Sequence, residues 1–93
     1  MGFVFLRTTI EDYDKWKPVF DDDAADRKAA GSGGGQLFRD DQDANVVYIL
    51  FDWDLEKARE FGQSERLAKK MQQGGVLGPP DIFFMNEVEK LSS

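Results

Sequence analysis

The chain has 93 residues, of which 41% are hydrophobic and 32% are charged, and it carries a net charge of −6 with a sequence pI of about 4.5. This size and composition are typical of one globular domain with a modest core, and the acidic balance argues against nucleic acid or an anionic membrane as a partner. The sequence contains neither cysteine nor histidine, which excludes disulfides and thiolate chemistry and removes the usual general base and the commonest metal and haem ligand.

The first third of the chain predicts a strand followed by an interrupted helix. Phe3–Thr8 is rich in Phe and Val and predicts the strand. Thr9, with Asp12 three residues later, has the spacing of a capping box, and helical character runs over residues 11–30. Pro18 lies within this helix and predicts a kink or a restart, because an interior proline removes a backbone hydrogen bond and clashes with the preceding turn.

The start of the chain does not look like a targeting segment. Its apolar run covers only Phe3–Leu6, whereas a secretory signal or a membrane span needs a longer one. We therefore expect a cytoplasmic protein.

A glycine-rich segment, GSGGG at Gly31–Gly35, ends the first helix. Gly31 suits the left-handed position that terminates many helices. Phosphate-binding loops lead from a strand into a helix, whereas this segment leads from a helix into a strand. The sequence therefore favours a plain turn over a nucleotide site.

Two strands separated by a polar loop are predicted in the middle of the chain. Gln36–Arg39 predicts a short strand, and Asp40–Asn45 (DDQDAN) predicts a hairpin loop. A calcium site in that loop is disfavoured because the downstream glycine and glutamate of a calcium-binding loop are missing. Asn45–Trp53 (NVVYILFDW) predicts a strand because it is short, β-branched and aromatic.

The last third predicts a second interrupted helix and a final strand. Asp54 is the expected N-cap of the helix, and Ser64 is the expected N-cap of a second segment that stops at Gly74. Gly75–Pro80 predicts a rigid loop, and Asp81–Val88 predicts the strand. The inward face of the two helical segments is Leu55, Ala58, Phe61, Leu67, Ala68 and Met71.

The resulting order is β-α-β-β-α-β over a single domain, residues 1–93. This order is typical of the ferredoxin-like α+β fold, in which a four-stranded antiparallel sheet carries two helices on one face.

The predicted strands are apolar on both faces, although two helices can cover only one face. Along the third strand, Tyr48 and Leu50 lie on one face and Ile49, Phe51 and Trp53 on the other, because side chains alternate between faces. A wet apolar face of this size is rare on monomers, so we expect a homodimer in which two sheet faces pack together. The alternative is a monomer with aromatic-rich, partly exposed strands.

Three segments carry a resemblance to a known group of proteins: Asp12–Gly31 (DYDKWKPVFDDDAADRKAAG), Val46–Asp54 (VVYILFDWD) and Gly75–Phe84 (GVLGPPDIFF). The chain resembles the dimeric α+β barrel proteins, and in particular the antibiotic biosynthesis monooxygenase-like group with its small, cyclase-labelled bacterial members. The resemblance covers nearly the whole chain. It implies a dimeric α+β barrel but does not specify an activity.

One position departs from this group. Relatives often carry a histidine where this chain has Asp23, and an aspartate cannot simply replace it because its ordinary pKa is several units lower. Haem-degrading relatives hold iron through a histidine, and the absence of histidine argues against that branch. We therefore expect no metal and no cofactor.

Trp16, Phe20, Asp23 and Arg27 are spaced i, i+4, i+7 and i+11, so they fall on one stripe of a helix. Two charges in a stripe that otherwise faces the sheet resist burial unless they are paired or hydrogen-bonded. The functional interpretation is a cavity between helix and sheet, with Asp23 as the catalytic acid/base or as a ligand acceptor, and Arg27 holding an anionic or carbonyl group. The alternative is an ordinary Asp23–Arg27 pair on the helix flank.

Further candidates for the walls of this cavity are Tyr13, Tyr48, Asp52 and Trp53, because aromatic walls with a few polar groups suit a planar organic ligand. The same residues could instead belong to the core or to a dimer interface. The aspartates between positions 21 and 26 point in different directions along a helix, which favours a solvated acidic face over a metal site.

Three functions remain open from the sequence. The first is a cofactor-independent monooxygenase-like or cyclase/isomerase-like enzyme for an aromatic or polyketide-like substrate. In such oxygenases the substrate itself, as an enolate or phenolate, reacts with dioxygen, and the protein supplies shape, desolvation and a few polar groups. The second is a non-catalytic ligand-binding or sensory module that uses the same pocket. The third is a dimer whose cavity is filled by its own side chains.

Overall fold

The computed structural model describes residues 2–93, which form four strands and four helices. The strands are β1 (Gly2–Thr9), β2 (Ser32–Arg39), β3 (Val46–Trp53) and β4 (Asp81–Asn86). The helices are α1 (Tyr13–Asp22), α2 (Ala24–Ala29), α3 (Leu55–Gly62) and α4 (Glu65–Gln73). Each of the two predicted helices is therefore present as a pair of shorter helices. No helix in this part of the chain is long and apolar enough to cross a membrane.

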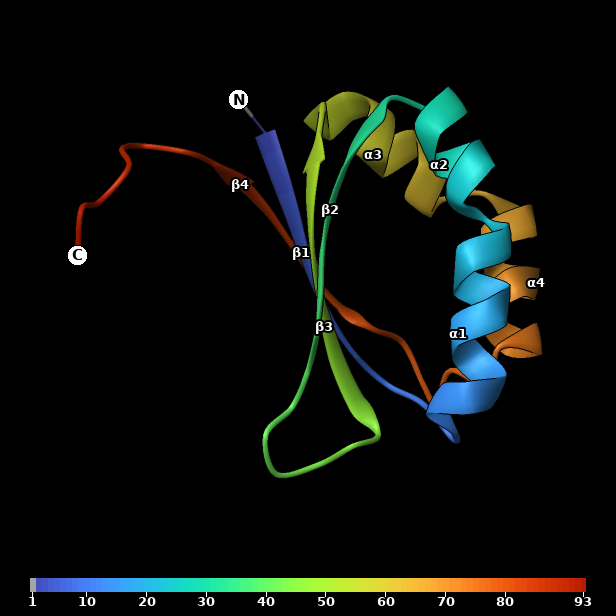
Figure 1. Ribbon diagram of the computed structural model, residues 1–93. Coiled ribbons are helices and arrows are strands. Elements are labelled where there is room, and N and C mark those ends of the chain that lie inside the picture. Colours follow the sequence, from blue (N-terminus) through green and yellow to red (C-terminus); the bar gives the residue numbers. More distant parts are fainter. Residues whose placement is uncertain (1) are drawn as a thin grey trace.

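The four strands form one antiparallel sheet in the order β2-β3-β1-β4. All four helices pack on one face of this sheet, and no helix or strand of residues 2–93 covers the other face (Figure 1). The predicted ferredoxin-like α+β fold is confirmed. The order places β1 and β3, the two strands richest in buried residues, at the centre of the sheet.

The buried core lies between the sheet and the helical layer. Val47, Ile49, Phe51 and Trp53 point from β3 towards the helices, and each is less than 10% exposed, at 0%, 5%, 7% and 4%. Trp16 of α1 packs into the same cluster. Since side chains alternate along a strand, the other apolar residues of β3 must point to the opposite face.

The first helix begins and breaks at other positions than the sequence predicts. Thr9 is not its N-cap, because β1 continues to Thr9, which pairs with Val46; Asp12 precedes the helix instead and makes no side-chain capping bond. Pro18 lies inside α1 without ending it. It is exposed to solvent and gives up one backbone bond only. The break between α1 and α2 lies at Asp23.

The glycine-rich segment is a turn only at its first residue. Gly31 has the predicted positive φ, of 101°, but the strand expected to begin at Gln36 begins four residues earlier, at Ser32. The strand extends because β3 runs on to Trp53 and pairs there with Ser32, across an irregularity in register. Gly35 is required at this point, since a Cβ there would lie 1.9 Å from the carbonyl oxygen of Leu50.

The second helical region follows the prediction closely. The Asp54 carboxylate accepts the backbone N–H of Lys57 at 3.2 Å, and the Ser64 hydroxyl accepts that of Leu67 at 3.3 Å. Both predicted caps are confirmed. The final strand ends at Asn86, two residues earlier than predicted.

The uncovered face of the sheet is rich in large apolar side chains. Phe38, Phe83 and Met85 are 46%, 54% and 39% exposed, and Phe5 and Leu50 beside them are half-buried. The chain after β4 extends away from the body on this side of the sheet (Figure 1).

Candidate functional site

A cavity of about 330 Å³ lies between the helical layer and the covered face of the sheet. We call it the inner cavity. Every strand except β2 and every helix except α2 contributes apolar side chains to its wall, which Arg27 of α2 completes. Its large aromatic wall residues are Trp16, Phe20, Phe51, Trp53, Phe61 and Phe84. Such a wall suits a flat, apolar ligand.

Asp23 is the most deeply buried charged side chain in the described part of the chain, at 4% exposure, and it lines the inner cavity. It sits where α1 ends and α2 begins. Burial raises the pKa of its carboxyl group, and the opposing charges of Arg66 and Arg27 reduce that rise. A carboxyl group with a raised pKa is a stronger base than an ordinary aspartate and is better suited to acid–base chemistry near neutral pH.

The partner of Asp23 is Arg66 of α4, whose Nη2 lies 3.3 Å from Asp23 Oδ1. The alternative of a simple Asp23–Arg27 ion pair is therefore wrong. Arg66 also pairs with Asp26, and Lys70, one turn further along α4, contacts Asp22 at 2.5 Å. This Lys70 contact lowers the pKa of Asp22, so two adjacent aspartates have pKa values shifted in opposite directions.

Arg27 is half-buried, and its guanidinium group lies over an aromatic ring. Its guanidinium carbon is 3.9 Å from the centroid of the Phe20 ring and 5.6 Å from that of Phe51. Its Nη1 donates a hydrogen bond of 2.9 Å to the backbone carbonyl of Phe20. Burial lowers the pKa of Arg27, but a guanidinium stays charged in proteins.

Five of the predicted site residues line the inner cavity: Trp16, Phe20, Asp23, Arg27 and Trp53. The first four come from the predicted helical stripe, which the break at Asp23 does not disrupt. Trp53 Nε1 donates to the carbonyl of Ala30 at 3.0 Å, and this bond holds the indole against the end of α2.

The two predicted tyrosines do not line this cavity. Tyr48 lies on the uncovered face of the sheet, stacked 6.0 Å from Phe5, and its hydroxyl donates to Asp40 at 2.7 Å. Tyr13 packs beside Trp16 at 5.8 Å, and the guanidinium of Arg39 covers its ring at 4.1 Å. Asp52 occupies a β3 position on the same face as Tyr48. The expectation that these residues share a hollow with Trp53 is wrong.

The contribution of α4 to the site was not predicted from the sequence. Arg66 and Lys70 are spaced i, i+4 on one face of that helix, and this spacing is the signal that could have marked them as partners of the acidic segment. Thr8 of β1 was also missed. It lines the inner cavity, and its buried hydroxyl has no hydrogen-bond partner among residues 2–93.

The acidic segment between positions 21 and 26 is held by ion pairs. Within residues 2–93, no cluster of three or more acidic, histidine or cysteine side chains is arranged to hold a metal ion. The carboxylates pair instead with basic side chains, on α4 and one turn earlier on α1.

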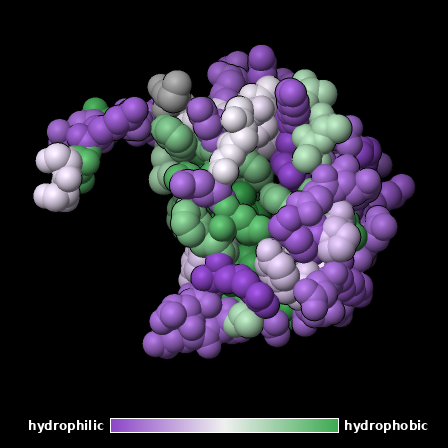
Figure 2. Space-filling view, in the orientation of Figure 1, coloured by the Kyte–Doolittle hydropathy of each residue, from purple (hydrophilic) through white to green (hydrophobic). Residues whose placement is uncertain are grey.

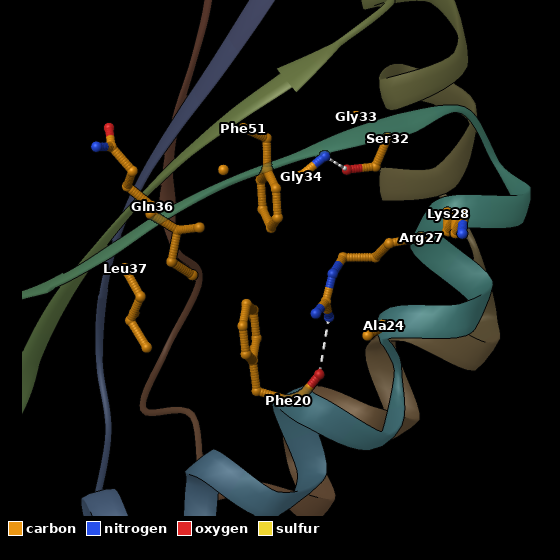
Figure 3. A pocket seen from close by; sticks show the side chains of 12 residues that line it. Phe20, Ala24, Arg27, Lys28, Ser32, Gly33, Gly34, Gln36, Leu37 and Phe51 are labelled. Carbon is orange, nitrogen blue, oxygen red and sulfur yellow. Dashed lines mark hydrogen bonds between the residues drawn. The ribbon is translucent and has the colours of Figure 1, made fainter.

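A second cavity, of about 490 Å³, opens between α2 and the glycine-rich start of β2. We call it the outer cavity (Figure 3). Its wall shares four residues with that of the inner cavity, so the two cavities are neighbours: Phe20, Arg27, Ile49 and Phe51. Figure 2 shows hydrophobic side chains visible from solvent in the hollow between the sheet and the helices on this side.

Comparison with known proteins identifies the fold. No family model matches the chain, and no curated protein matches it in sequence. Among solved structures, it is similar to SnoaB, a cofactor-independent oxygenase from Streptomyces nogalater, with a TM-score of 0.78 and 14% identity over 99% of this chain and 97% of that one. It is also similar to a candidate antibiotic biosynthesis monooxygenase from Bordetella bronchiseptica, with a TM-score of 0.78 and 14% identity over 95% and 97% of the two chains.

A third similar structure is a candidate antibiotic biosynthesis monooxygenase from Caulobacter crescentus, with a TM-score of 0.73 and 21% identity over 95% of this chain and 90% of that one. The chain therefore has the fold of the antibiotic biosynthesis monooxygenase-like structures over nearly its whole length, and the resemblance noted in the sequence is confirmed at the level of fold. At these identities, the likeness does not carry an activity with it.

Proposed function

We propose that the chain binds a planar aromatic or polyketide-like molecule in the inner cavity and acts on it as a cofactor-independent monooxygenase-like enzyme. The observation that carries the proposal is Asp23, a buried carboxyl group with a raised pKa in the wall of an aromatic cavity. The structurally similar protein SnoaB is described as a cofactor-independent oxygenase, and this likeness supports the same reaction class.

In this proposal Asp23 acts as the base. It removes a proton from a carbon that the adjoining carbonyl or phenol groups of the substrate acidify, and the resulting enolate transfers an electron to dioxygen. Recombination forms a C–O bond, and Asp23 returns the proton to the peroxide. Loss of the second C–H proton and cleavage of the O–O bond then give a carbonyl group and water, so that CH₂ and O₂ become C=O and H₂O. The dry aromatic wall disfavours competing reactions of the enolate with water.

Asp23→Asn tests this role, with Asp22→Asn as a matched control. Asp22 is the adjacent acid, its side chain is 71% exposed, and it lies outside the wall of the inner cavity. In oxygen-uptake assays on a panel of anthrone-like and quinol substrates, we expect Asp23→Asn to lose about 10²–10⁴-fold in rate. Asp22→Asn should keep the wild-type rate within about twofold. Equal rates for Asp23→Asn and wild type would rule Asp23 out as the base.

Substrate conversion without oxygen consumption would instead identify a cyclase or isomerase. Both of these reactions need the same proton removal by Asp23 but consume no dioxygen. Product analysis under nitrogen separates them from an oxygenase, because an oxygenase stops when dioxygen is removed.

A non-catalytic binding or sensory module is the second candidate. The two tryptophans of the chain, Trp16 and Trp53, both line the inner cavity, so intrinsic fluorescence reports ligand binding directly. Saturable quenching without turnover of any ligand would identify a binding module. No quenching by any member of the panel would contradict both candidates and favour a cavity that serves packing alone.

The chain is further proposed to form a homodimer through the uncovered face of the sheet. The exposed Phe38, Phe83 and Met85 on this face support the proposal, because apolar patches of this kind mark interaction surfaces. Sedimentation at low micromolar concentration should give a particle of twice the 10.6 kDa chain mass. A well-folded particle of single mass would contradict the proposal.

A further inference from the structure

Two basic side chains beside the outer cavity, Arg27 and Lys28, have no acidic partner within 4.0 Å among residues 2–93. The acidic residues nearby are already paired with other cations: Asp21 with Lys17, Asp22 with Lys70, and both Asp23 and Asp26 with Arg66. Arg27 and Lys28 therefore place two positive charges beside the outer cavity of a chain whose net charge is −6.

Arg27 is also left with unused hydrogen-bond donors. Of the five N–H groups of a guanidinium, one is used by the 2.9 Å bond to the carbonyl of Phe20. Its other N–H groups have no acceptor among the described residues. Because the group is half-buried and its charge is partly desolvated, a bound anion would stabilise it by supplying both the acceptors and the opposite charge.

The outer cavity gives an anion room to reach these donors. Ala24 and Lys28 line it on the helical side, and Ser32 with Gly33–Gly35 lines it on the side of β2 (Figure 3). A Cβ added at Gly34 would meet no atom within 4 Å, so this part of β2 leaves the space open. The Ser32 hydroxyl accepts the N–H of Gly34 at 3.2 Å, which leaves its own hydrogen free to donate.

We propose that the outer cavity is a carboxylate-binding subsite and that the ligand of the protein is a planar aromatic acid. Its rings would occupy the inner cavity, and its carboxylate would lie on Arg27, with Lys28 and Ser32 beside it. Arg27 lines both cavities, and its planar fork matches a carboxylate. The proposal rests on the proposed function, since it names the substrate class of the same site.

A pair of ligands that differ only in charge tests the subsite. Anthraquinone-2-carboxylate and the uncharged anthraquinone-2-carboxamide are titrated against the tryptophan fluorescence of the full chain. We expect wild type to bind the acid about tenfold more tightly than the amide, because a charge-assisted hydrogen bond contributes more than a neutral one. Added salt should reduce this preference.

Variants assign the preference to residues. Arg27→Gln should weaken binding of the acid about tenfold and leave the amide within about twofold, whereas Arg27→Lys should keep part of the preference because it keeps the charge without the fork. Lys28→Gln should weaken the acid about threefold. Lys69→Gln is the control, because it removes the same charge from a residue that lines neither cavity.

Each outcome decides between the proposals. Equal binding of acid and amide by wild type, or equal losses for both ligands in Arg27→Gln, would overturn the subsite and leave the inner cavity as a binding site. Failure of both ligands to bind wild type would overturn the subsite and the proposed function together. If Arg27→Gln proves unfolded by circular dichroism, Arg27→Lys and Lys28→Gln decide, and an unchanged acid preference in both would overturn the subsite.

Discussion

The two faces of the sheet are built from the same kinds of residue but have different surroundings. Phe51 of β3 points into the helical layer and is 7% exposed, whereas Phe83 of β4 points to the uncovered face and is 54% exposed. The covered face encloses a cavity with charged groups at its wall, and the uncovered face is open to solvent or to a second chain. Residue type alone therefore does not tell where a phenylalanine contributes to folding and where it contributes to assembly.

The largest expected effect comes from removing the same side chain on each face. Phe51→Ala should lower the free energy of unfolding by about 3–5 kcal/mol, because it leaves a cavity in the core. Phe83→Ala should change it by less than about 1 kcal/mol. Urea unfolding at low protein concentration, where a dimer contributes least, measures both. Equal losses would mean that the two faces are equally buried in the folded protein.

Dimer formation should depend on the uncovered face rather than on the covered face. Phe83→Glu places a charge in the centre of the proposed dimer interface and should raise the dimer dissociation constant at least about tenfold. Leu77→Glu is the matched control and should leave the dimer intact. Leu77 lies in the loop before β4 and is similarly exposed, at 51%. Sedimentation over a range of concentrations measures the constants, and the proposed interface is wrong if both variants dissociate to the same extent.

The covered face should also show an unusual dependence of stability on pH. Because burial raises the pKa of Asp23, the folded protein binds more protons than the unfolded chain above the ordinary aspartate pKa of about 3.9. The contribution of Asp23 to stability is therefore present at low pH and is lost as the pH rises through its folded pKa. Asp23→Asn should remove this loss, so its stability relative to wild type should increase as the pH rises.

Asp22→Asn should behave in the opposite way. Lys70 lowers the pKa of Asp22, so the stabilising contribution of Asp22 is present above its unfolded pKa and is lost as the pH falls through the folded value. This variant should be less stable than wild type near neutral pH and equal to it in acid. Chemical unfolding between about pH 3 and about pH 8 compares the two variants. Parallel curves would contradict the opposite shifts.

The smallest effect is expected from Tyr48→Phe. Tyr48 points away from the inner cavity and hydrogen-bonds to Asp40 on the uncovered face, so the affinity for an aromatic ligand should stay within about twofold of wild type. Trp53 lies five residues further along the same strand, on the opposite face and in the cavity wall, so Trp53→Phe should weaken binding of the same ligand measurably. The fluorescence of both tryptophans reports the Tyr48→Phe titration, and that of Trp16 alone reports the Trp53→Phe titration. A loss with Tyr48→Phe that matched the loss with Trp53→Phe would place the ligand elsewhere.

Local patterns in the sequence predicted β1, β3, β4 and the second helical region well, whereas β2 begins four residues before its predicted start. The caps at Asp54 and Ser64 depend on hydrogen bonds within one turn of helix, and the alternation along β3 follows from the geometry of a strand. The same alternation separates Tyr48 from Trp53, so the sequence already contained the signal that the two could not share one cavity.

The helical period also predicted part of the candidate site correctly. Trp16, Phe20, Asp23 and Arg27 follow the helical period, and all four line the inner cavity. The errors arose where distant segments decide local structure. Thr9 belongs to β1 because it pairs with Val46, and nothing in its neighbouring residues predicts that pairing.

The sequence by itself determined the order of elements, the apolar faces of the strands and the stripe that carries Asp23, because each depends on neighbours a few residues apart. Only the tertiary structure decided that Asp23 pairs with Arg66, 43 residues away, and that Arg27 keeps free donors beside an open cavity. Ion pairing and burial depend on which segments the fold brings together. In this protein, the packing of α4 against the break between α1 and α2 converts a charged helical stripe into a candidate site.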